Sequence, residues 1–347
     1  MKRTLVLTEN ISEPVDEGMK KFSYQLAKYI AGLNNGNQIF SSFANNDIPN
    51  IKRLPKNKIF FSISFFRRIF SYNPQLLVYV PSSSTTLMSF IRLAMVSLFC
   101  REAKKIMFSL QERKHNYISK KIISVLKPDH LVVLSTKEAI YYQTLGLQCI
   151  VSPIGVESEK FKEITLSEKQ KLRLRLKLPV NCKIALHVGH INKGRNLEIL
   201  KGLISKGYTV AIVASTRFES DMQLKAELEK IGYIFITDYI ENIEEYYQTS
   251  DIYVFPVLSS SSAMEFPMSV LEAMSCNLAV MTTRFGGIES FLTETSWFKY
   301  FLNEKELMAK IDTFPLNSDC SNRQVVLSKF SWDNVFDNLF LNIRLAG

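Results

Sequence analysis

Cysteine and long apolar runs are scarce in this 347-residue chain. The five cysteines are Cys100, Cys149, Cys182, Cys276 and Cys320, and no two of them form a CxxC pair. Such spacing argues against a disulfide framework or a structural zinc site and favours reduced thiols. The longest apolar stretch, Leu87 to Cys100, is interrupted by Arg92 and is too short to span a bilayer. We therefore expect it to form a buried helix.

Several sequence patterns that mark cofactor sites and secretion are also missing. The segment after the first apolar run, TENISEPVDEG, has no G-x-G-x-x-G pattern, which argues against a Rossmann oxidoreductase. There is no DxD motif and no cluster of metal ligands, so we expect neither a metal nor a resident cofactor. The first residues, MKRTLVLTENISEP, lack the apolar core of a signal peptide. These absences favour a cytoplasmic protein.

The composition is that of a globular protein large enough for two domains, with 46% apolar and 22% charged residues. The formal charge is +10, which favours anionic ligands or surfaces in general. Lys and Arg are spread along the whole chain and form no basic stripe, so we do not expect a nucleic-acid partner. An ordinary solvated basic surface is the competing explanation.

Short apolar strands alternate with helical segments in both halves, which predicts parallel sheets covered by helices. The Val151–Leu166 segment, with Pro153 and Gly155, indicates the link between two doubly wound units. A helix is expected from Arg195 and another over Pro267–Ser275. The predicted strands are Thr4–Leu7, Leu76–Val80, Lys105–Leu110, Leu131–Leu134, Lys183–Val188, Thr209–Ala214, Tyr233–Ile236, Ile252–Phe255 and Ala279–Met281.

A basic loop follows the first predicted strand of the second half. It contains His190, Lys193 and Arg195, directly after Gly189. In open α/β sheets ligands bind at the carboxyl ends of the strands, and clustered cations suit a diphosphate. A glycine turn with solvated cations is the alternative interpretation.

The second candidate segment is a helix that begins near Pro267 and contains Glu272. Its free first-turn N–H groups, near Ser269 to Leu271, can hold a phosphate. A carboxylate in an apolar helix needs a polar partner, and a ribose would supply one. The competing interpretation is a solvent-facing glutamate.

These two segments resemble the retaining GT-B glycosyltransferases of family 4. The family has a Gly-Arg and a Lys-Gly pair after this strand; His190 matches the arginine and Arg195 the lysine. The segment LEAM matches the second of two family glutamates at Glu272, which contacts the ribose in the family. The first glutamate aligns with Met264, so Glu265 replaces it in an E-x(6)-E spacing. SPIGVESEKF, DIYVFP, FGGIESF and FSWDNVFDNLF also resemble family segments.

The resemblance implies two Rossmann-like doubly wound domains facing each other across a cleft. The expected parts are residues 1–157 on the acceptor side, residues 158–327 on the donor side, and a helix over 328–347 that crosses back. Arg195, Lys193 and Glu265 are the implied catalytic residues. On the acceptor side the candidates are Lys20 and Gln111. The implied donor-binding residues are Gly18, His190, Arg195, Phe266, Pro267, Met268, Ser269, Val270, Leu271 and Glu272.

The implied activity is metal-independent, retaining transfer of a sugar from a UDP- or GDP-sugar to a hydroxyl of a glycan or lipid-linked acceptor. Cell-surface polysaccharide or glycolipid synthesis would be its setting. A degenerate member that binds the sugar nucleotide without turnover is the alternative. The aromatic segment Phe60–Phe70 has two interpretations, of which we favour a helix packed on the sheet. The other is an amphipathic membrane contact at the inner face of the membrane.

Overall fold

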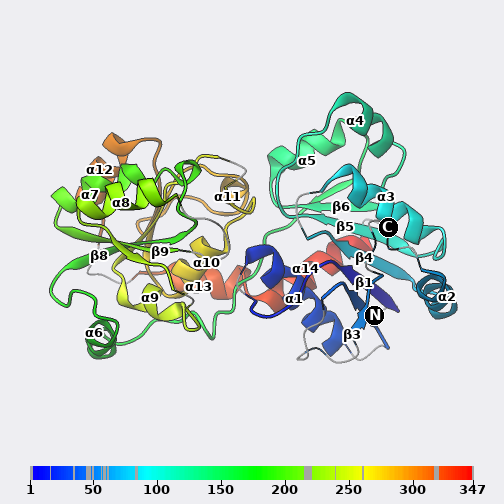
Figure 1. Ribbon diagram of the computed structural model, residues 1–347, viewed down its shortest axis with the longest axis horizontal. Coiled ribbons are helices and arrows are strands. Elements are labelled where there is room, and N and C mark those ends of the chain that lie inside the picture. The colour runs from blue at the N-terminus through cyan, green and yellow to red at the C-terminus, as the bar shows by residue number, and fades with distance from the viewer. Residues whose placement is uncertain are drawn as a thin grey trace. The chain divides into compact units, whose positions relative to one another are not determined.

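The computed structural model divides into two compact α/β units. One comprises Met1–Ile154, Met264–Phe266 and Val335–Gly347, and we call it unit 1. The other, unit 2, comprises Gly155–Ala263 and Pro267–Asn334. Each is a parallel sheet with helices on both faces (Figure 1). The structure describes residues 3–15, 17–33, 36–43, 48, 51–55, 57, 60, 62–82, 85–214, 221–238, 240–259, 262–315 and 320–345.

Unit 1 is built on a seven-stranded sheet of order β3-β2-β1-β4-β5-β6-β7, with all pairs parallel. Strands β2 and β3 are added on one side of β1, and β4 to β7 on the other, so the switch point of the sheet lies between β1 and β4. The strands are β1 (Thr4–Thr8), β2 (Gln38–Ser41), β3 (Ile51–Arg53), β4 (Leu76–Val80), β5 (Lys104–Ser109), β6 (His130–Val133) and β7 (Cys149–Val151). The helices are α1 (Gly18–Gly32), α2 (Ile63–Tyr72), α3 (Leu87–Ser97), α4 (Tyr117–Ile123), α5 (Thr136–Gln143) and α14 (Trp332–Leu345).

Unit 2 has a six-stranded parallel sheet of order β10-β9-β8-β11-β12-β13. Successive strands are added on one side of β8 up to β10 and on its other side from β11, so the switch point lies between β8 and β11. Its strands are β8 (Lys183–Gly189), β9 (Tyr208–Ala214), β10 (Ile234–Ile236), β11 (Ile252–Phe255), β12 (Ala279–Thr282) and β13 (Phe298–Tyr300). Its helices are α6 (Leu166–Arg175), η1 (Lys193–Arg195), η2 (Leu197–Leu200), α7 (Lys201–Ser205), α8 (Met222–Lys230), α9 (Glu244–Thr249), α10 (Met268–Ser275), α11 (Ile288–Phe291), α12 (Glu304–Asp312) and α13 (Asn322–Lys329).

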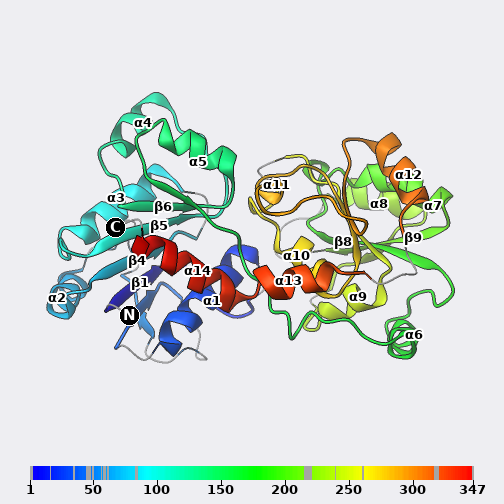
Figure 2. The same ribbon diagram turned by 180° about the vertical axis from the view of Figure 1, so that it is seen from behind.

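Each unit has its own apolar core, formed where the sheet meets its helices. Local signals set several helix starts. Thr86 and Thr165 form capping boxes before α3 and α6, and Ser135 caps α5. In unit 1 the end of the chain packs against the beginning, because Phe336 of α14 contacts Phe22 and Tyr29 of α1 (Figure 2).

The expected fold class, two doubly wound Rossmann-like domains, is confirmed. The helix expected from Arg195 is wrong: two short 3₁₀ turns come first, and regular α-helix begins only at Lys201. Asn196 separates the turns, with left-handed backbone (φ 54°), and its Nδ2 donates to the Pro256 carbonyl. Of the Phe60–Phe70 segment, residue 61 lies outside the described residues, and residues 63–70 are helical, which both interpretations allow.

Candidate functional site

The site predicted in the second half lies at the switch point of the unit 2 sheet. Strands β8 and β11 pair in parallel there, although seven other elements of the fold separate them in the chain order. Gly189 ends β8 and Phe255 ends β11, so both carboxyl ends meet at one edge. This edge is where doubly wound sheets bind ligands.

Arg195 is a buried cation at this edge. Its side chain is only 6% exposed and lies against Gly189, where a Cβ would come within 2.4 Å of the guanidinium. Burial lowers its pKa to about 10, so it remains charged at neutral pH. Among the described residues its Nε has no hydrogen-bond partner and no carboxylate pairs with it. An uncompensated buried charge is costly, so this position suits an anionic ligand.

His187, which the motifs did not single out, lies beside Arg195 inside β8. Its Nδ1 is 3.0 Å from the Val254 carbonyl, to which it donates, leaving Nε2 as an acceptor. Burial, followed by the Arg195 charge, lowers its pKa to about 3, so the ring is neutral. The neutral ring therefore does not repel the positive charge of Arg195. The available signal was a histidine inside an otherwise apolar strand, KIALHVG.

The remaining cations of the loop differ in exposure. Lys193 is exposed at the start of η1, and His190 is half-buried. Asn192 caps the turn by accepting a hydrogen bond from the Arg195 N–H. Gly194 lies against the loop that contains Ser262, where a Cβ would come within 2.1 Å of its Oγ. The fold thus buries one cation and leaves Lys193 free to reach solvent.

The first turn of α10 presents backbone rather than side-chain groups. Pro267 is the N-cap in extended conformation, and no side chain caps the helix. Val270 and Leu271 are fully buried, and Met268 nearly so. The Val270 N–H donates to the Pro267 carbonyl at 3.3 Å, so the N–H groups of Met268 and Ser269 are the polar contribution of this turn. Phe266 is also buried and belongs to unit 1. Uncapped N–H groups at a helix start favour a negative charge.

Glu272 lies one turn further along α10, 4% exposed, and accepts a 2.7 Å hydrogen bond from the Tyr247 hydroxyl. Burial and the Glu272 charge raise the pKa of Tyr247 well above its usual range, so Tyr247 stays a donor. Tyr253 of β11 lies close enough to Arg195 and Glu272 for their charges to affect its pKa, which the first lowers and the second raises. Its side chain also lies beside Ser269. The structure thus brings Arg195, Ser269 and Glu272 together around Tyr253.

Glu265 belongs to unit 1, within the Met264–Phe266 segment. Its N–H donates to the Leu110 carbonyl, and its Oε1 accepts from Ser135 Oγ at 3.0 Å. Burial raises its pKa, and Oε2 is buried with no hydrogen-bond partner among the residues that the structure describes. Nearby, Glu138 accepts from Ser109 Oγ and is also buried, which raises its pKa to about 8. Sequence reasoning did not find Glu138.

The other unit 1 candidates lie at the start of α1 and after β5. Gly18 begins α1, and Lys20 is buried with its Nζ 2.5 Å from the Pro14 carbonyl, so this lysine holds the preceding loop. Gln111 is half-buried. At the β1–β4 switch point, Glu9 accepts from Ser82 and pairs with Arg92 at 2.5 Å, a cluster that the motifs missed.

The described residues contain no group of three or more His, Cys, Asp or Glu side chains placed to hold a metal ion. None of the helices in the described ranges has both the length and the apolar character needed to cross a membrane.

Part of the second half of the chain is similar to known proteins. Residues 185–313 match the family model "Glycosyl transferases group 1". The sulfoquinovosyl transferase of Arabidopsis thaliana is 31% identical over 145 residues, which make up 40% of this chain and 27% of that protein. The chain therefore spans about a quarter of this curated relative.

Two solved structures resemble the chain over nearly its whole length. A glycosyltransferase from Rickettsia africae superposes with a TM-score of 0.80 at 16% identity, covering 99% of this chain and 98% of its own. The Anabaena protein HepE in complex with UDP gives 0.76 at 13% identity, covering 99% of both chains. At such identities the likeness shows the fold, which is the two-domain Rossmann-like GT-B fold.

Proposed function

We propose that this chain is a glycosyltransferase that takes a sugar from a nucleotide-diphosphate donor and transfers it to a hydroxyl acceptor. The observation that carries this proposal is Arg195, a buried, charged guanidinium at the switch point of unit 2 that has no counter-ion among the described residues. It lies inside the segment that matches the glycosyl transferase family model. A diphosphate is the anion that fits both facts.

Each residue of the unit 2 site then has a role in holding the donor. Arg195 and Lys193 bind the diphosphate, His190 lies near it, and the N–H groups of Met268 and Ser269 face one phosphate. Glu272 accepts hydrogen bonds from the ribose, while Tyr247 holds the carboxylate in position. The UDP complex of the structurally similar Anabaena protein supports a uridine donor.

The chemistry is departure of the nucleoside diphosphate and addition of the acceptor hydroxyl. Arg195, Lys193 and the start of α10 stabilise the charge that develops on the leaving group, without a metal. The sugar becomes oxocarbenium-like, and the acceptor hydroxyl adds on the face that the diphosphate left, which retains the anomeric configuration. The proton of that hydroxyl passes to the departing phosphate oxygen. Glu265, Gln111 and Gly18 of unit 1 contribute to the sugar and acceptor side.

The acceptor we propose is a hydroxyl of a glycan or a lipid-linked sugar, in polysaccharide or glycolipid synthesis at the cytoplasmic face of a membrane. The name of the Arabidopsis relative, a sulfoquinovosyl transferase, supports a sugar as the transferred group.

Thermal unfolding with UDP, GDP and ADP in the presence of a chelator tests the donor site. A ligand that binds only the folded state stabilises it by about 2.7 kcal/mol at one hundred times its Kd. We expect one base to raise the midpoint, and Glu272→Ala to remove that shift. Glu198→Ala, an exposed glutamate of the same unit, is the matched control and should keep it.

Turnover separates the proposal from its alternative. Incubation with the matching sugar nucleotide and candidate acceptors should give a glycoside whose anomeric configuration, measured by NMR, equals that of the donor. Binding without transfer to any acceptor would favour a degenerate sugar-nucleotide binder. No midpoint shift with any nucleotide would refute the site.

A further inference from the structure

Helix α2 of unit 1 carries apolar side chains on the face that packs on the sheet and also on the face that is exposed. Phe65, Phe66 and Ile69 are buried in the unit 1 core and anchor the helix. On the outer side, Ile63 is 64% exposed and Phe70 is 73% exposed. These two large apolar side chains of the ten-residue helix do not pack on the sheet, so the packing of α2 does not account for them.

The apolar rim continues onto the end of α3. Phe66 stacks on Phe99 with ring centroids 4.1 Å apart, and Leu98 beside it is 62% exposed. Ile63 and Phe70 are one turn to either side of Phe66 on the helix, so they border this contact. Four exposed or partly exposed apolar side chains therefore gather at the α2–α3 junction.

A basic pocket lies along the same helix. It has a volume of about 520 Å³ and is lined by Gln38, Lys52, Arg67, Arg68, Ser71 and Tyr72. None of its three cations forms an ion pair with any residue that the structure describes. Burial and the neighbouring Arg68 charge lower the pKa of Lys52. An anion in the pocket would relieve this repulsion.

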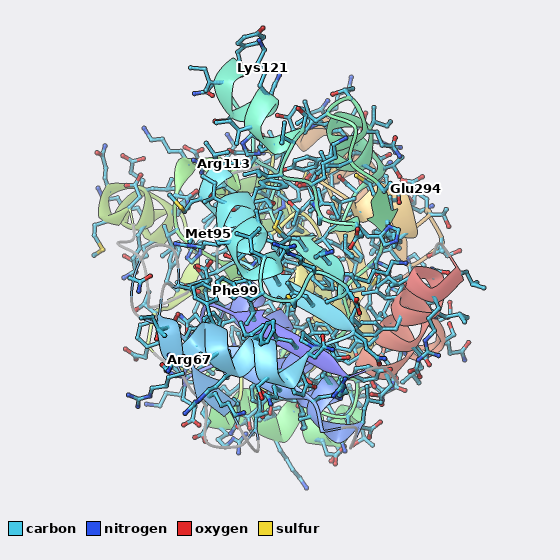
Figure 3. All side chains as sticks on the ribbon, turned by 90° about the vertical axis from the view of Figure 1, so that its right-hand side faces the viewer. Arg67, Met95, Phe99, Arg113, Lys121 and Glu294 are labelled. Carbon is cyan, nitrogen blue, oxygen red and sulfur yellow. The ribbon has the colours of Figure 1, made fainter. Side chains whose placement is uncertain are left out.

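The charge extends across one side of unit 1. Tyr117 and Ile118 at the start of α4 are exposed and lie near Lys121, whose Nζ is 4.5 Å from the Tyr117 ring. The labelled side chains on the side of the unit turned to the viewer are Arg67, Phe99, Met95, Arg113 and Lys121 (Figure 3). Mixed aromatic and basic groups of this kind suit the interface of an anionic bilayer.

We propose that this side of unit 1, the α2–α4 face, docks on a membrane that contains anionic lipids. A lipid phosphate occupies the pocket of Lys52, Arg67 and Arg68, and Ile63 and Phe70 enter the interface. Charge complementarity selects this partner, because the exposed apolar groups suit lipid, and the three cations, which form no ion pair with the described residues, suit phosphate. The inference does not depend on the transfer chemistry proposed above.

Co-sedimentation of the full chain with vesicles tests it, comparing phosphatidylcholine alone with phosphatidylcholine plus phosphatidylglycerol at low salt. We expect binding only to the anionic vesicles. Each cation near the surface contributes about fivefold, so Arg67→Gln with Arg68→Gln should weaken binding by about 25-fold. Ile63→Ser with Phe70→Ser should also weaken it, by removing the apolar insertion.

Matched controls are Lys230→Gln with Lys305→Gln, and Leu166→Ser with Leu302→Ser, all exposed in unit 2. Both should bind like the wild type, and all variants should keep the nucleotide-dependent midpoint shift. Equal binding of the arginine variant and its control, or no binding to anionic vesicles, would overturn the proposal. So would stabilisation by inorganic phosphate that needs these arginines but occurs without vesicle binding, which would indicate a free-anion site.

Discussion

Two buried arginines of unit 2 show how the same side chain serves structure or function. Arg173 is 5% exposed and saturated: it donates to the Thr249 and Cys182 carbonyls and pairs with Asp251 at 2.7 Å. Arg195 is equally buried, yet its Nε has no partner within the described chain. The first arginine therefore stabilises the fold, whereas the second costs free energy until a ligand arrives.

We predict opposite stability effects for Arg195→Met and Arg173→Met. The Arg195 change should raise the free energy of unfolding of the ligand-free protein by about 1 kcal/mol and abolish nucleotide binding. The Arg173 change should lower that free energy by about 3 kcal/mol, because it leaves Asp251 with one partner fewer. Urea unfolding with and without nucleotide measures both. Destabilisation by Arg195→Met with binding intact would contradict the donor role.

The raised pKa of Glu138 should make the free energy of unfolding depend on pH. Its pKa is about 8 in the fold, chiefly because of burial, against about 4.3 in an unfolded chain. The fold thus holds a proton that the unfolded chain releases. The stability it contributes is complete below about pH 4.3 and is lost as the pH rises through about 8.

Glu138→Gln should remove this dependence, since glutamine stays neutral and can still accept from Ser109. Between about pH 5 and about pH 8, the wild type should lose stability relative to the variant at up to about 1.4 kcal/mol per pH unit. Urea unfolding across that range measures the difference, with Glu198→Gln as an exposed control. Parallel pH profiles for wild type and Glu138→Gln would show that the carboxyl is ionised in the fold.

At the scale of elements, the β8–η1 connection determines where Arg195 lies. The strand ends at Gly189, and the chain makes a 3₁₀ turn capped by Asn192 before Asn196 adopts left-handed backbone. A continuous helix from Arg195 would instead follow the ordinary strand-to-helix pattern. The short turn directs the guanidinium back over Gly189 and towards the Phe255 ring, 6.0 Å away.

Gly189→Ala should therefore weaken nucleotide binding by displacing Arg195. An added Cβ would come within 2.4 Å of one guanidinium nitrogen and 3.2 Å of His187 Nε2. We expect a loss of about tenfold in affinity, or about 1.4 kcal/mol, measured by titration calorimetry. Gly32→Ala, where a Cβ would meet nothing within 4 Å, is the control. Unchanged affinity in the Gly189 variant would show that Arg195 does not contact the donor.

At the scale of the whole molecule, the two units have separate cores, so they need not unfold as one. Arg195 and Glu272 both belong to unit 2. A nucleoside diphosphate should therefore protect β8, η1 and the start of α10 from hydrogen exchange more than β1 to β6. Exchange mass spectrometry with and without nucleotide measures this. Protection confined to unit 1 would place the donor elsewhere.

The sequence by itself determined the alternation of strands and helices, and with it the two doubly wound units. Periodicity and strand composition are local, so most of the predicted strands match the structure to within a residue or two. The motif residues Arg195, Ser269 and Glu272 were also proposed from the sequence. Arg195 follows a strand and Ser269 lies in the first turn of a helix, while Glu272 is a carboxylate within an apolar helix. Their roles remain predictions.

Only the tertiary structure decided which of these groups are buried and what contacts them. Arg195 rather than Lys193 became the uncompensated cation because it folds back over Gly189, beside His187 of β8. Glu265 joined unit 1 because its N–H reaches the carbonyl of Leu110, far earlier in the chain. Burial and charge depend on segments that are distant in sequence, and no local pattern encodes how those segments pack.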